Sequence, residues 1–327
     1  MKKLVITCTI VSGLGMMSVN AEAEILTDHV ETLEMMMSSV TWTMPESIGQ
    51  NVNTPETSEF APRVSEDMLT LFFSSWDRPG GYGEIDIWVS TRATINDPWG
   101  LPTNAGPSVN TEYNDYFGVT STDMLEFYFT SDRPGGHNDE DIYVSTRSSQ
   151  GDEWEAPSNL GPQVNAAAWT CQATFTHNML LMYLSAEGPN GDSEIFVSTR
   201  DSVNDPWGSV ANIGTPVNTE YEDTNPSLSS DGLTLYFDSD RPGSPGAGGI
   251  WQTTRYSIDD SWLEPVALPP SINTNDVFTP WILSDGTTLM FGREVDGNRD
   301  IYQSIPEPAT LSLLALGGLL LRRRKRA

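Results

Sequence analysis

The sequence predicts an all-β fold: a five-bladed β-propeller of four-stranded antiparallel blades, closed by an outer strand from the N-terminal side. Three observations lead to this prediction. One sequence unit of about 54 residues recurs five times between residues 42 and 304. Each copy contains short runs of alternating apolar and polar residues, rich in β-branched and aromatic types, which are separated by turn residues. The last copy lacks its final piece, and a matching piece stands before the first copy.

The two middle strands of each blade are the clearest part of the unit. An aromatic run leads into Ser-Asp-Arg-Pro-Gly or a degraded form of it, and a second run of the form Asp-Ile-aromatic follows. Proline removes a hydrogen-bond donor and glycine permits positive φ, so the segment between the runs is a turn. The first run stands at 71–81, 127–136, 182–189, 235–243 and 289–294, and the second at 86–92, 141–147, 194–200, 249–255 and 300–304.

The innermost strand of each blade is expected directly before a Ser-x-Asp turn, because Asp, Asn and Gly are the usual occupants of tight turns. In the third copy Thr176-His177-Asn178 takes the place of that turn. The inner strands predicted in this way carry no Asp or Glu. They are residues 60–64, 116–120, 173–175, 226–228 and 280–283.

The outermost strand of each blade is expected in a Trp-containing stretch that ends in Val-Asn or Ile-Asn. Four such stretches follow the second runs, but the fifth copy stops at Ser304. The missing stretch stands at 42–54, so the N-terminal side is predicted to supply the outer strand of the last blade. Closure of this kind removes the open sheet edges that invite aggregation. The four stretches end at Asn110, Asn165, Asn218 and Asn273.

The unit resembles the TolB-type, WD-repeat-like propeller repeat, whose pattern is a Ser-x-Asp-Gly turn, an aromatic strand, Ser-Asp-Arg-x-Gly and Asp-Ile-Tyr. The resemblance covers residues 42–304. It departs from the pattern where Glu187-Gly188 and Arg293-Glu294 replace Asp-Arg, which puts the uniformity of the blades in question. The resemblance implies a recognition scaffold, since members of that family share no catalytic residues.

The N-terminal end is predicted to be a secretory signal peptide. Lys2 and Lys3 form a basic start, an apolar stretch follows, and Ala21-Glu22-Ala23 is a small-x-small cleavage site. Glycines and hydroxyl residues dilute the apolar stretch, which argues against a permanent transmembrane anchor. We therefore expect residues 1–23 to be removed, 24–40 to be a short linker and 41–304 to form the propeller.

The C-terminal end combines three parts that are typical of a sorting signal. They are, in order, Pro306-Glu307-Pro308, an apolar run at 309–321, and a basic cluster that begins with Arg322, Arg323 and Arg324. As a helix the run would reach about 20 Å, short of the roughly 30 Å hydrocarbon core, so it suits transient membrane association during export. Residues 305–327 resemble the PEP-CTERM sorting signal of bacteria that make exopolysaccharide, which an exosortase reads. The resemblance implies export to the cell surface, the outer envelope or the extracellular matrix.

The charge of the chain limits its partners. The formal net charge is -28, from 17 Lys and Arg against 45 Asp and Glu. Nucleic acid needs a basic surface that displaces its counterions, so this charge argues against nucleic acid and against acidic partners in general. A strongly anionic surface favours solubility, and we expect a monomer.

Arginine stands at repeated positions of the unit. Every cation between the terminal segments is Arg, and seven of these ten arginines fall at two motif positions. We expect the repeated Asp-Arg pairs to lock the hairpin loops through hydrogen bonds to neighbouring carboxylates or carbonyls, which is a structural role. The same role is expected for Asp86, Asp141 and Asp300. The pairs are Asp77-Arg78, Asp132-Arg133 and Asp240-Arg241.

Ligand binding is expected on the face where the loops between the middle strands meet the loops that enter the inner strands. Residues there that break the repeat are the candidates, and exposed aromatic side chains beside polar groups would suit stacking against carbohydrate. For Trp76 and Trp169, the filling of gaps between blades is an equally weighted interpretation. The candidates are Trp76, Tyr82, His137, Trp169, Glu187 and Glu294.

The sequence contains no pattern that predicts a cofactor or a metal site. The acidic loops at 139–141 and 220–223 could hold calcium loosely through oxygen ligands, but EF-hand spacing is absent and solvation of the charges is the preferred interpretation. The three histidines are too scattered for a zinc site. Cys171, the only cysteine after the leader, is expected to be a small buried side chain and not a nucleophile.

These observations predict an exported recognition scaffold for polysaccharide or protein, without catalysis. The alternative is a glycoside hydrolase, because five-bladed propellers can carry carboxylates in the central channel. The lack of Asp and Glu in the predicted inner strands argues against it. The enzyme interpretation gains weight if two unpaired carboxylates line the channel.

Overall fold

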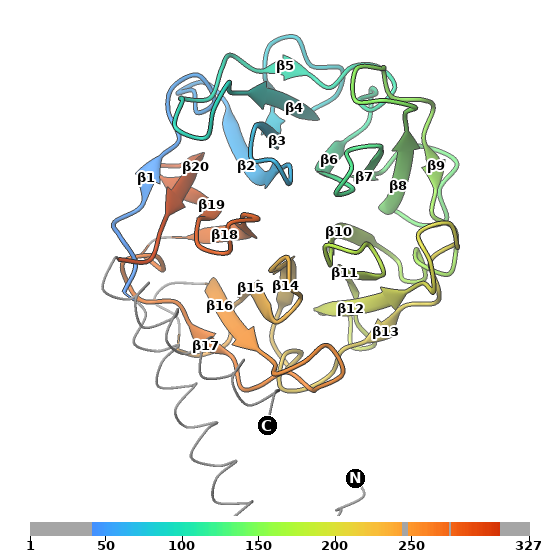
Figure 1. Ribbon diagram of the computed structural model, residues 1–327, viewed down its shortest axis with the longest axis vertical. Helices are drawn as coiled ribbons and strands as arrows, with labels where there is room; N and C mark the ends of the chain where they lie inside the picture. The colour runs from blue at the N-terminus through green and yellow to red at the C-terminus, as the bar shows by residue number, and fades with distance from the viewer. Residues whose placement is uncertain (1–40, 244–247, 275, 308–327) are drawn as a thin grey trace, which may run out of the picture.

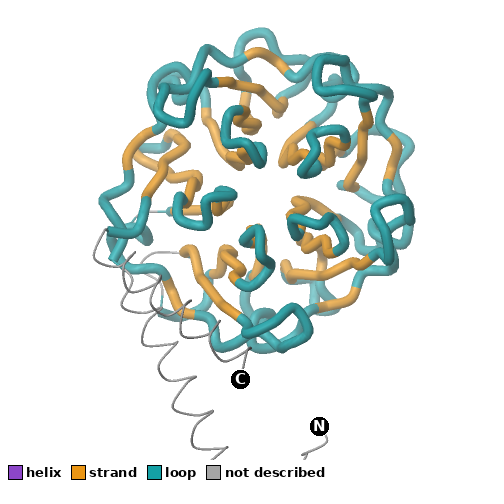
Figure 2. Tube along the Cα trace, viewed as in Figure 1, coloured by secondary structure: helices purple, strands orange, loops and turns teal. Residues whose placement is uncertain are grey.

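The structure, a computed structural model, describes residues 41–243, 248–274 and 276–307. Within these ranges the chain forms five four-stranded antiparallel sheets, and no helix occurs in them. The sheets stand in a ring around a central axis, and the inner strand of each sheet lies nearest that axis (Figures 1 and 2). The predicted five-bladed β-propeller is therefore confirmed. No helix of these residues is long and apolar enough to cross a membrane.

The blades are numbered in chain order, and each begins with its innermost strand. Blade 1 consists of β2 (Ser58–Val64), β3 (Thr70–Trp76), β4 (Ile85–Thr91) and β5 (Thr103–Asn104). Blade 2 consists of β6 (Asp115–Thr120), β7 (Glu126–Ser131), β8 (Asp141–Thr146) and β9 (Ser158–Asn159). Blade 3 consists of β10 (Thr170–Phe175), β11 (Leu181–Glu187), β12 (Ser193–Thr199) and β13 (Ala211–Asn212). Blade 4 consists of β14 (Asp223–Leu228), β15 (Thr234–Ser239), β16 (Gly249–Thr254) and β17 (Val266–Ala267). Blade 5 consists of β18 (Val277–Ile282), β19 (Leu289–Val295), β20 (Asn298–Ser304) and β1 (Glu46–Ser47).

The ring is closed by pairing between the two ends of the propeller. β1 is antiparallel to β20, with Glu46 opposite Gln303 and Ser47 opposite Tyr302. Figure 1 shows β1 at the outer edge of blade 5, beside β20. A further antiparallel bridge joins Trp42 to Pro306. The predicted outer strand from the N-terminal side is confirmed.

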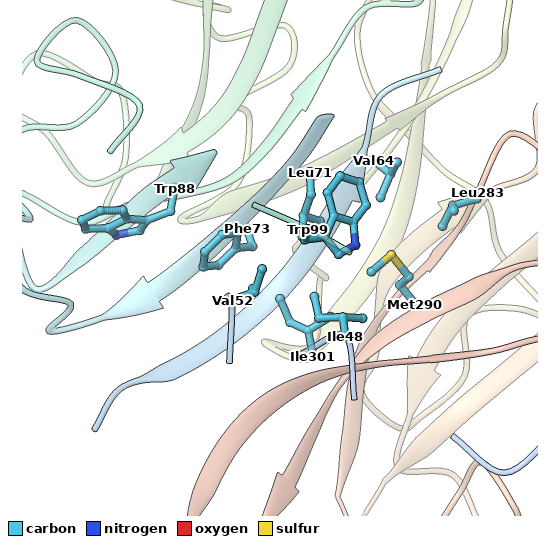
Figure 3. Packing of buried hydrophobic residues seen from close by; sticks show 10 residues of the cluster. All are labelled: Ile48, Val52, Val64, Leu71, Phe73, Trp88, Trp99, Leu283, Met290 and Ile301. Atoms are coloured by element: carbon cyan, nitrogen blue, oxygen red, sulfur yellow. The ribbon is translucent and has the colours of Figure 1, made fainter. Parts of the chain in front are cut away.

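Apolar side chains pack between neighbouring blades. At the closing junction, Leu71 and Phe73 of blade 1 belong to one buried cluster with Met290 and Ile301 of blade 5 (Figure 3). Val52, from the segment between β1 and β2, is fully buried in the same cluster. Side chains alternate between the two faces of a strand, and both faces of a middle strand meet a neighbouring blade. This is the physical reason that aromatic and branched residues dominate the middle strands.

Every inner strand contains a bulge at the same position, where one residue other than glycine has positive φ. These residues are Ala61, Phe117, Gln172, Asn225 and Thr279, with φ between 52° and 57°. Such a conformation is unfavourable and persists only where the surrounding contacts require it. Each backbone N–H donates to a side chain of the preceding blade, so five hydrogen bonds tie the ring together around the axis. The acceptors are Thr279 Oγ1, Ser74 Oγ, Thr130 Oγ1, Ser185 Oγ and Asp238 Oδ2, respectively.

All five inner strands begin earlier than the sequence predicts, and in three of them the added residues include an acid. β2 begins at Ser58, β6 at Asp115 and β14 at Asp223, so these strands contain Glu59, Asp115 and Asp223. The expectation that the inner strands carry no carboxylate is therefore wrong. A buried strand tolerates these acids because each binds an arginine that follows 18 or 19 residues later. The alternation of residues in the sequence does not reveal that pairing.

Candidate functional site

The repeated arginines of the Asp-Arg motif bind the acids at the start of the inner strands. Arg133 Nη2 donates to Asp115 Oδ1 at 2.6 Å and to the carbonyl oxygen of Val109 at 2.5 Å. Arg78 Nη1 donates to Glu59 Oε1 at 3.1 Å, and Arg241 binds the Asp223 carboxylate in the same way. The three carboxylates are fully buried. Each arginine thus joins the loop that follows the second strand of its blade to the start of the innermost strand of the same blade.

The aspartates of the motifs hold loops through backbone and amide donors. The Asp132 carboxylate accepts from Asn114 N at 2.8 Å and from Asn114 Nδ2 at 2.9 Å. Asp86 Oδ2 accepts from Tyr82 N at 2.6 Å, and burial raises the pKa of Asp86. Asp141 Oδ2 accepts from Asn159 Nδ2 at 2.9 Å. Asp77 has a φ of 52° at the end of β3, Asp240 accepts from Glu222 N at 2.9 Å, and Asp300 accepts from Asn298 Nδ2 at 3.3 Å.

A cavity of about 550 Å³, the mouth pocket, opens at the end of the axis where the inner strands begin. Three aromatic side chains, Tyr116, Phe117 and Trp169, form part of its wall. Its size is within the range of small-molecule sites in proteins, which usually combine aromatic walls with a few polar groups. The mouth pocket is lined by Tyr116, Phe117, Asp132, Asp139, Glu140, Trp169, Cys171, Ser193, Thr224 and Asn225.

Trp169 is held between blades 2 and 3 by its backbone neighbours. The loop of blade 2 donates from Asp139 N to Ala168 O at 3.1 Å, and Thr170 N donates to Glu140 O at 2.8 Å. On the other side Glu187 N donates to Trp169 O at 3.3 Å. These bonds fix the backbone of the segment on both sides before any ligand binds.

Glu140 is the partly buried acid of the mouth pocket. The Tyr116 hydroxyl lies close to its carboxylate, and this contact lowers the pKa of Glu140. Burial has the larger effect and raises the pKa of Glu140. Burial together with the nearby carboxylate also raises the pKa of Tyr116. The pair therefore places one carboxylate acceptor and one hydroxyl donor in the wall of the pocket.

A second cavity, the side pocket, measures about 270 Å³ and lies between blades 4 and 5. Thr224 lines both cavities, and Asn225 of the mouth pocket donates from Nδ2 to Asp238 Oδ2 in the side pocket at 2.7 Å. The two pockets are therefore neighbours on the same face. The side pocket is lined by Glu222, Thr224, Asp238, Ser239, Asp240, Gly248, Gly249, Asp276, Val277 and Phe278.

Asp238 is the buried acid of the side pocket. Its Oδ2 accepts from Asn225 Nδ2 and from Thr279 N, whereas its Oδ1 has no hydrogen-bond partner among the described residues. The side chain is 9% exposed, and burial raises its pKa from 3.8 to about 7. Sequence analysis missed Asp238. The available signal was its place in the repeat, where blades 1 to 3 have Ser74, Thr130 and Ser185.

Arg63 occupies the axis below the mouth pocket. It stands on β2, is 1% exposed, and its guanidinium lies 4.8 Å from the centre of the Trp281 ring and 6.0 Å from that of Phe117. Burial lowers its pKa to about 9. Sequence analysis did not single out Arg63, although it is one of only three arginines between the terminal segments that stand outside the repeated positions. Cys171 is buried beside it, and burial raises the pKa of the thiol.

The candidate ligand residues of the sequence lie around this face but do not gather in one pocket. Trp169 lines the mouth pocket, and Glu187 bonds to it through the backbone. Trp76 is 40% exposed, 6.2 Å from the Phe60 ring, and Tyr82 is 51% exposed. His137 is an exposed loop residue of blade 2, and Glu294 pairs with Arg299 at 3.5 Å. The ligand-binding role of all six remains a prediction.

The C-terminal residues match a known protein-sorting motif. The PEP-CTERM protein-sorting motif matches residues 304–326. This propeller carries a PEP-CTERM sorting motif. The motif indicates an exported protein that is processed at the cell envelope and recognised by exosortase-type sorting machinery. Within it, Pro306 and Glu307 are described by the structure, whereas Pro308 and Arg322, Arg323 and Arg324 lie outside the described residues.

Solved structures share the fold of this PEP-CTERM propeller. TolB from Agrobacterium tumefaciens is 16% identical, with a TM-score of 0.53 over 80% of this chain and 83% of that chain. An alpha-L-arabinofuranosidase from Lactobacillus brevis is 14% identical, with a TM-score of 0.54 over 79% and 93%. TolB from Acinetobacter baumannii is 14% identical, with a TM-score of 0.49; the match covers 79% of this chain and 56% of that one. For the two matches with TM-scores of 0.53 and 0.54, the likeness at these identities shows the fold alone. A comparison with curated proteins found no match.

Candidate metal ligands were sought in the part of the chain that the structure describes. Among the described residues no group of three or more His, Cys, Asp or Glu side chains is arranged to hold a metal ion. The loosely bound calcium considered from the sequence remains an expectation.

Proposed function

We propose that this PEP-CTERM propeller acts at the cell surface or in the extracellular matrix as a non-catalytic recognition protein, whose mouth pocket binds polysaccharide. The observation that carries the proposal is the combination of Trp169 and Tyr116 with the carboxylates of Asp139 and Glu140 in one cavity. Aromatic faces stack against the apolar face of a sugar ring, and carboxylate oxygens accept from sugar hydroxyl groups.

The rigidity of the pocket supports recognition. Trp169 is held by backbone bonds to both neighbouring blades, and Tyr116 stands on the inner strand β6. A site that is formed before the ligand arrives loses little entropy on binding. The same pocket on a mobile loop would bind a flexible polymer less well.

The pairing of the inner-strand acids supports a role without catalysis. Glu59, Asp115 and Asp223 are each bound to an arginine, which occupies their carboxylate oxygens. A glycoside hydrolase needs two carboxyl groups that are free to donate a proton and to attack or to activate water. None of these three acids has that freedom.

A glycoside hydrolase is retained as the second candidate because of Asp238. A carboxyl group whose pKa burial raises to about 7 can hold a proton close to neutral pH, as a general acid must, and Asp238 lines the side pocket. Assays of aryl glycosides and polysaccharides with the propeller and with Asp238→Asn test this candidate. Turnover that disappears in Asp238→Asn would replace the recognition proposal by an enzymatic one.

Binding to an array of neutral, acidic and amine-bearing glycans tests the recognition proposal. We expect the propeller to bind at least one class, and Trp169→Ala to weaken that binding about ten-fold through loss of the stacking surface. Leu101→Ala is the control, because Leu101 is 80% exposed and lies outside both pockets. Failure to bind any glycan class, with the protein folded, contradicts the proposal.

A further inference from the structure

The first residues of the sorting motif belong to blade 5 and follow the propeller repeat. Ser304, the last residue of β20, donates from Oγ to Thr43 O at 2.8 Å, and Thr43 N donates to Ile305 O at 2.9 Å. Each of the other four blades makes the same two bonds, with the residue that follows the tryptophan of its outer stretch. These contacts join Ser90 and Thr91 to Gly100, Ser145 and Thr146 to Glu155, Ser198 and Thr199 to Gly208, and Thr253 and Thr254 to Leu263.

Pro306, the first proline of the motif, stands where the other blades have arginine. It follows Asp300 by six residues, as Arg92 follows Asp86. Arg92 N donates to Leu69 O at 3.0 Å, and its guanidinium lies 4.2 Å from the centre of the Trp99 ring. Proline has neither an N–H nor a guanidinium, so Pro306 can make neither contact. The same two contacts recur at Arg147, Arg200 and Arg255.

The tryptophan of this pair is present in blade 5 and comes from the N-terminal side. Trp42 is 5% exposed and belongs to a buried cluster with Tyr236 and Leu289. It forms an antiparallel bridge with Pro306, which is also buried. Burial of a tryptophan side chain removes a large apolar area from water, so Trp42 anchors its segment on the blade.

Residues 41–43, the cover segment, hold the backbone on both sides of Pro306. Glu307 N donates to Thr41 O at 2.8 Å, and Ile305 N donates to Thr43 Oγ1 at 3.2 Å. Together with the bond from Thr43 N to Ile305 O, these contacts extend the pairing of β1 with β20 into the sorting motif. The start of the motif is therefore engaged by another segment of the same chain.

A second protein needs the same backbone groups. The motif begins at residue 304 and is recognised by exosortase-type sorting machinery. A protein that binds an extended peptide commonly does so through the peptide's N–H and C=O groups, as an added strand. We propose that the cover segment and the sorting machinery compete for residues 305–307, so that the motif is processed only while the cover segment is detached. Trp42 sets how often that happens.

Detachment of the cover segment does not require the ring to open. Asn53 still binds both backbone groups of Ile301, and Val52 stays fully buried in the closing junction. Local openings of this kind need less free energy than global unfolding. The exchange of arginine for proline at Pro306 also leaves this edge with fewer contacts than the corresponding edges of the other blades. Processing is thus compatible with a folded propeller.

The rate of processing tests the competition. The full-length chain is produced together with an exosortase in a bacterium that exports it, and the conversion to the shorter form is followed by pulse–chase and intact mass. Trp42→Ala weakens the anchor of the cover segment, and we expect processing to be at least about five-fold faster. Trp207→Ala is the matched control, because Trp207 has the same place in the repeat of blade 3 and is 7% exposed. We expect its rate to change by less than about two-fold.

Hydrogen exchange identifies the cause of the faster processing. In unprocessed protein from a host without exosortase, the amides of Ile305 and Glu307 should exchange faster in Trp42→Ala than in the natural protein. The amides of these two residues should be unchanged in Trp207→Ala. Thermal unfolding checks that both variants are folded.

A crosslink should have the opposite effect. The hydroxyl oxygens of Thr43 and Ser304 lie 3.2 Å apart, so the double variant Thr43→Cys with Ser304→Cys can form a disulfide that holds the cover segment in place. We expect the oxidised variant to be processed at less than about a tenth of the natural rate, and reduction to restore processing. Ser304→Cys alone is the control for the change in the motif. Cys171 is buried and does not compete for the bridge.

Three results would overturn the proposal. Unchanged processing of Trp42→Ala, despite faster exchange at Ile305 and Glu307, shows that the cover segment does not limit access. An equal acceleration in Trp207→Ala shows that overall stability sets the rate. Processing of the oxidised crosslinked variant at the natural rate shows that the machinery acts on the covered motif, and this variant decides the question if Trp42→Ala does not fold. None of these results bears on glycan binding, so the proposed function is tested separately.

Discussion

Asn53 binds both backbone groups of Ile301, although 248 residues separate them. Asn53 Nδ2 donates to Ile301 O at 2.8 Å, and Ile301 N donates to Asn53 Oδ1 at 3.0 Å. The other four blades repeat this pair of bonds between residues only 23 apart. The pairs are Asn110 with Ile87, Asn165 with Ile142, Asn218 with Ile195, and Asn273 with Ile250. The closing blade therefore uses the same contact as the others, supplied from the opposite end of the propeller.

Asn53→Ala tests the closing contact. The variant leaves the buried N–H and C=O of Ile301 without partners, so we expect the free energy of unfolding to fall by roughly 2 to 4 kcal/mol. Because Asn53 joins the two ends of the ring, we also expect faster proteolysis within blade 5. Denaturant unfolding and limited proteolysis measure both effects. Asn110→Ala is the matched control. It should lower the free energy of unfolding by a similar amount without making blade 5 more sensitive to protease. Early cleavage of blade 5 in both variants would contradict the closing role of Asn53.

Arg133→Met tests the pairing of a motif arginine with an inner-strand acid. Removal of the guanidinium leaves the Asp115 carboxylate buried and without its ion-pair partner, so we expect a loss of about 3 to 5 kcal/mol in the free energy of unfolding. In the double variant that combines Arg133→Met with Asp115→Asn, the unpaired carboxylate charge is also removed. We expect this double variant to recover more than half of the lost free energy of unfolding. Urea denaturation of the single and double variants measures the coupling.

The control for these single and double variants is Arg147→Met. Arg147 lies 4.1 Å from the centre of the Trp154 ring and donates to Met124 O at 2.8 Å, without a buried acid. We expect Arg147→Met to lower the free energy of unfolding by about 1 kcal/mol. If the effects of Arg133→Met and Asp115→Asn simply add, the two side chains do not act as a pair.

Asp238→Asn tests the effect of the buried carboxyl group on stability. The folded-state pKa of Asp238, about 7, lies above its ordinary value of 3.8, so the folded protein holds this proton more tightly. The resulting stabilisation is present below about pH 4 and is lost as the pH rises through about 7. We therefore expect Asp238→Asn to be more stable than the natural protein at pH 8, by roughly 1 to 4 kcal/mol.

The comparison with the natural protein at each pH isolates Asp238. Burial also raises the pKa of Glu59, Asp86 and Glu140, but these groups titrate in both proteins. The stability difference should shrink as the pH falls from 8 to 5. A difference that is the same at both pH values would mean that Asp238 does not titrate in this range.

The repeat made most of the fold predictable, because each strand pattern occurs several times and a degraded copy can be placed by its neighbours. Even Glu187 and Arg293, which break the Asp-Arg motif, lie on regular middle strands. The starts of the inner strands were not predictable in the same way. Glu59 and Asp223 look like loop residues until their arginine partners are known. A charge on a strand is acceptable only when a partner from another segment neutralises it.

The candidate site was predictable in its location but not in its composition. Trp169 was identified because it stands in a loop that enters an inner strand. Asp238 was missed because a Phe-Asp-Ser-Asp run looks like ordinary alternation, although the aligned positions in three other blades are hydroxyl residues. Arg63 was missed because the side chains that surround it come from other blades. Repetition reveals what the blades share, whereas a binding site depends on where they differ.

The sequence by itself determined the number of blades, the order of their strands, the circular closure and the C-terminal sorting motif, because local alternation, turn residues and a short motif are all written in consecutive residues. The tertiary structure alone decided which acids are neutralised and which remain free. Asp115 has an ion-pair partner because Arg133 reaches it. Oδ1 of Asp238 has no partner because the donors among the described residues, Asn225 and Thr279, bind its other oxygen. The charge of a buried group depends on atoms that folding brings near it, and their distances are not encoded in sequence spacing.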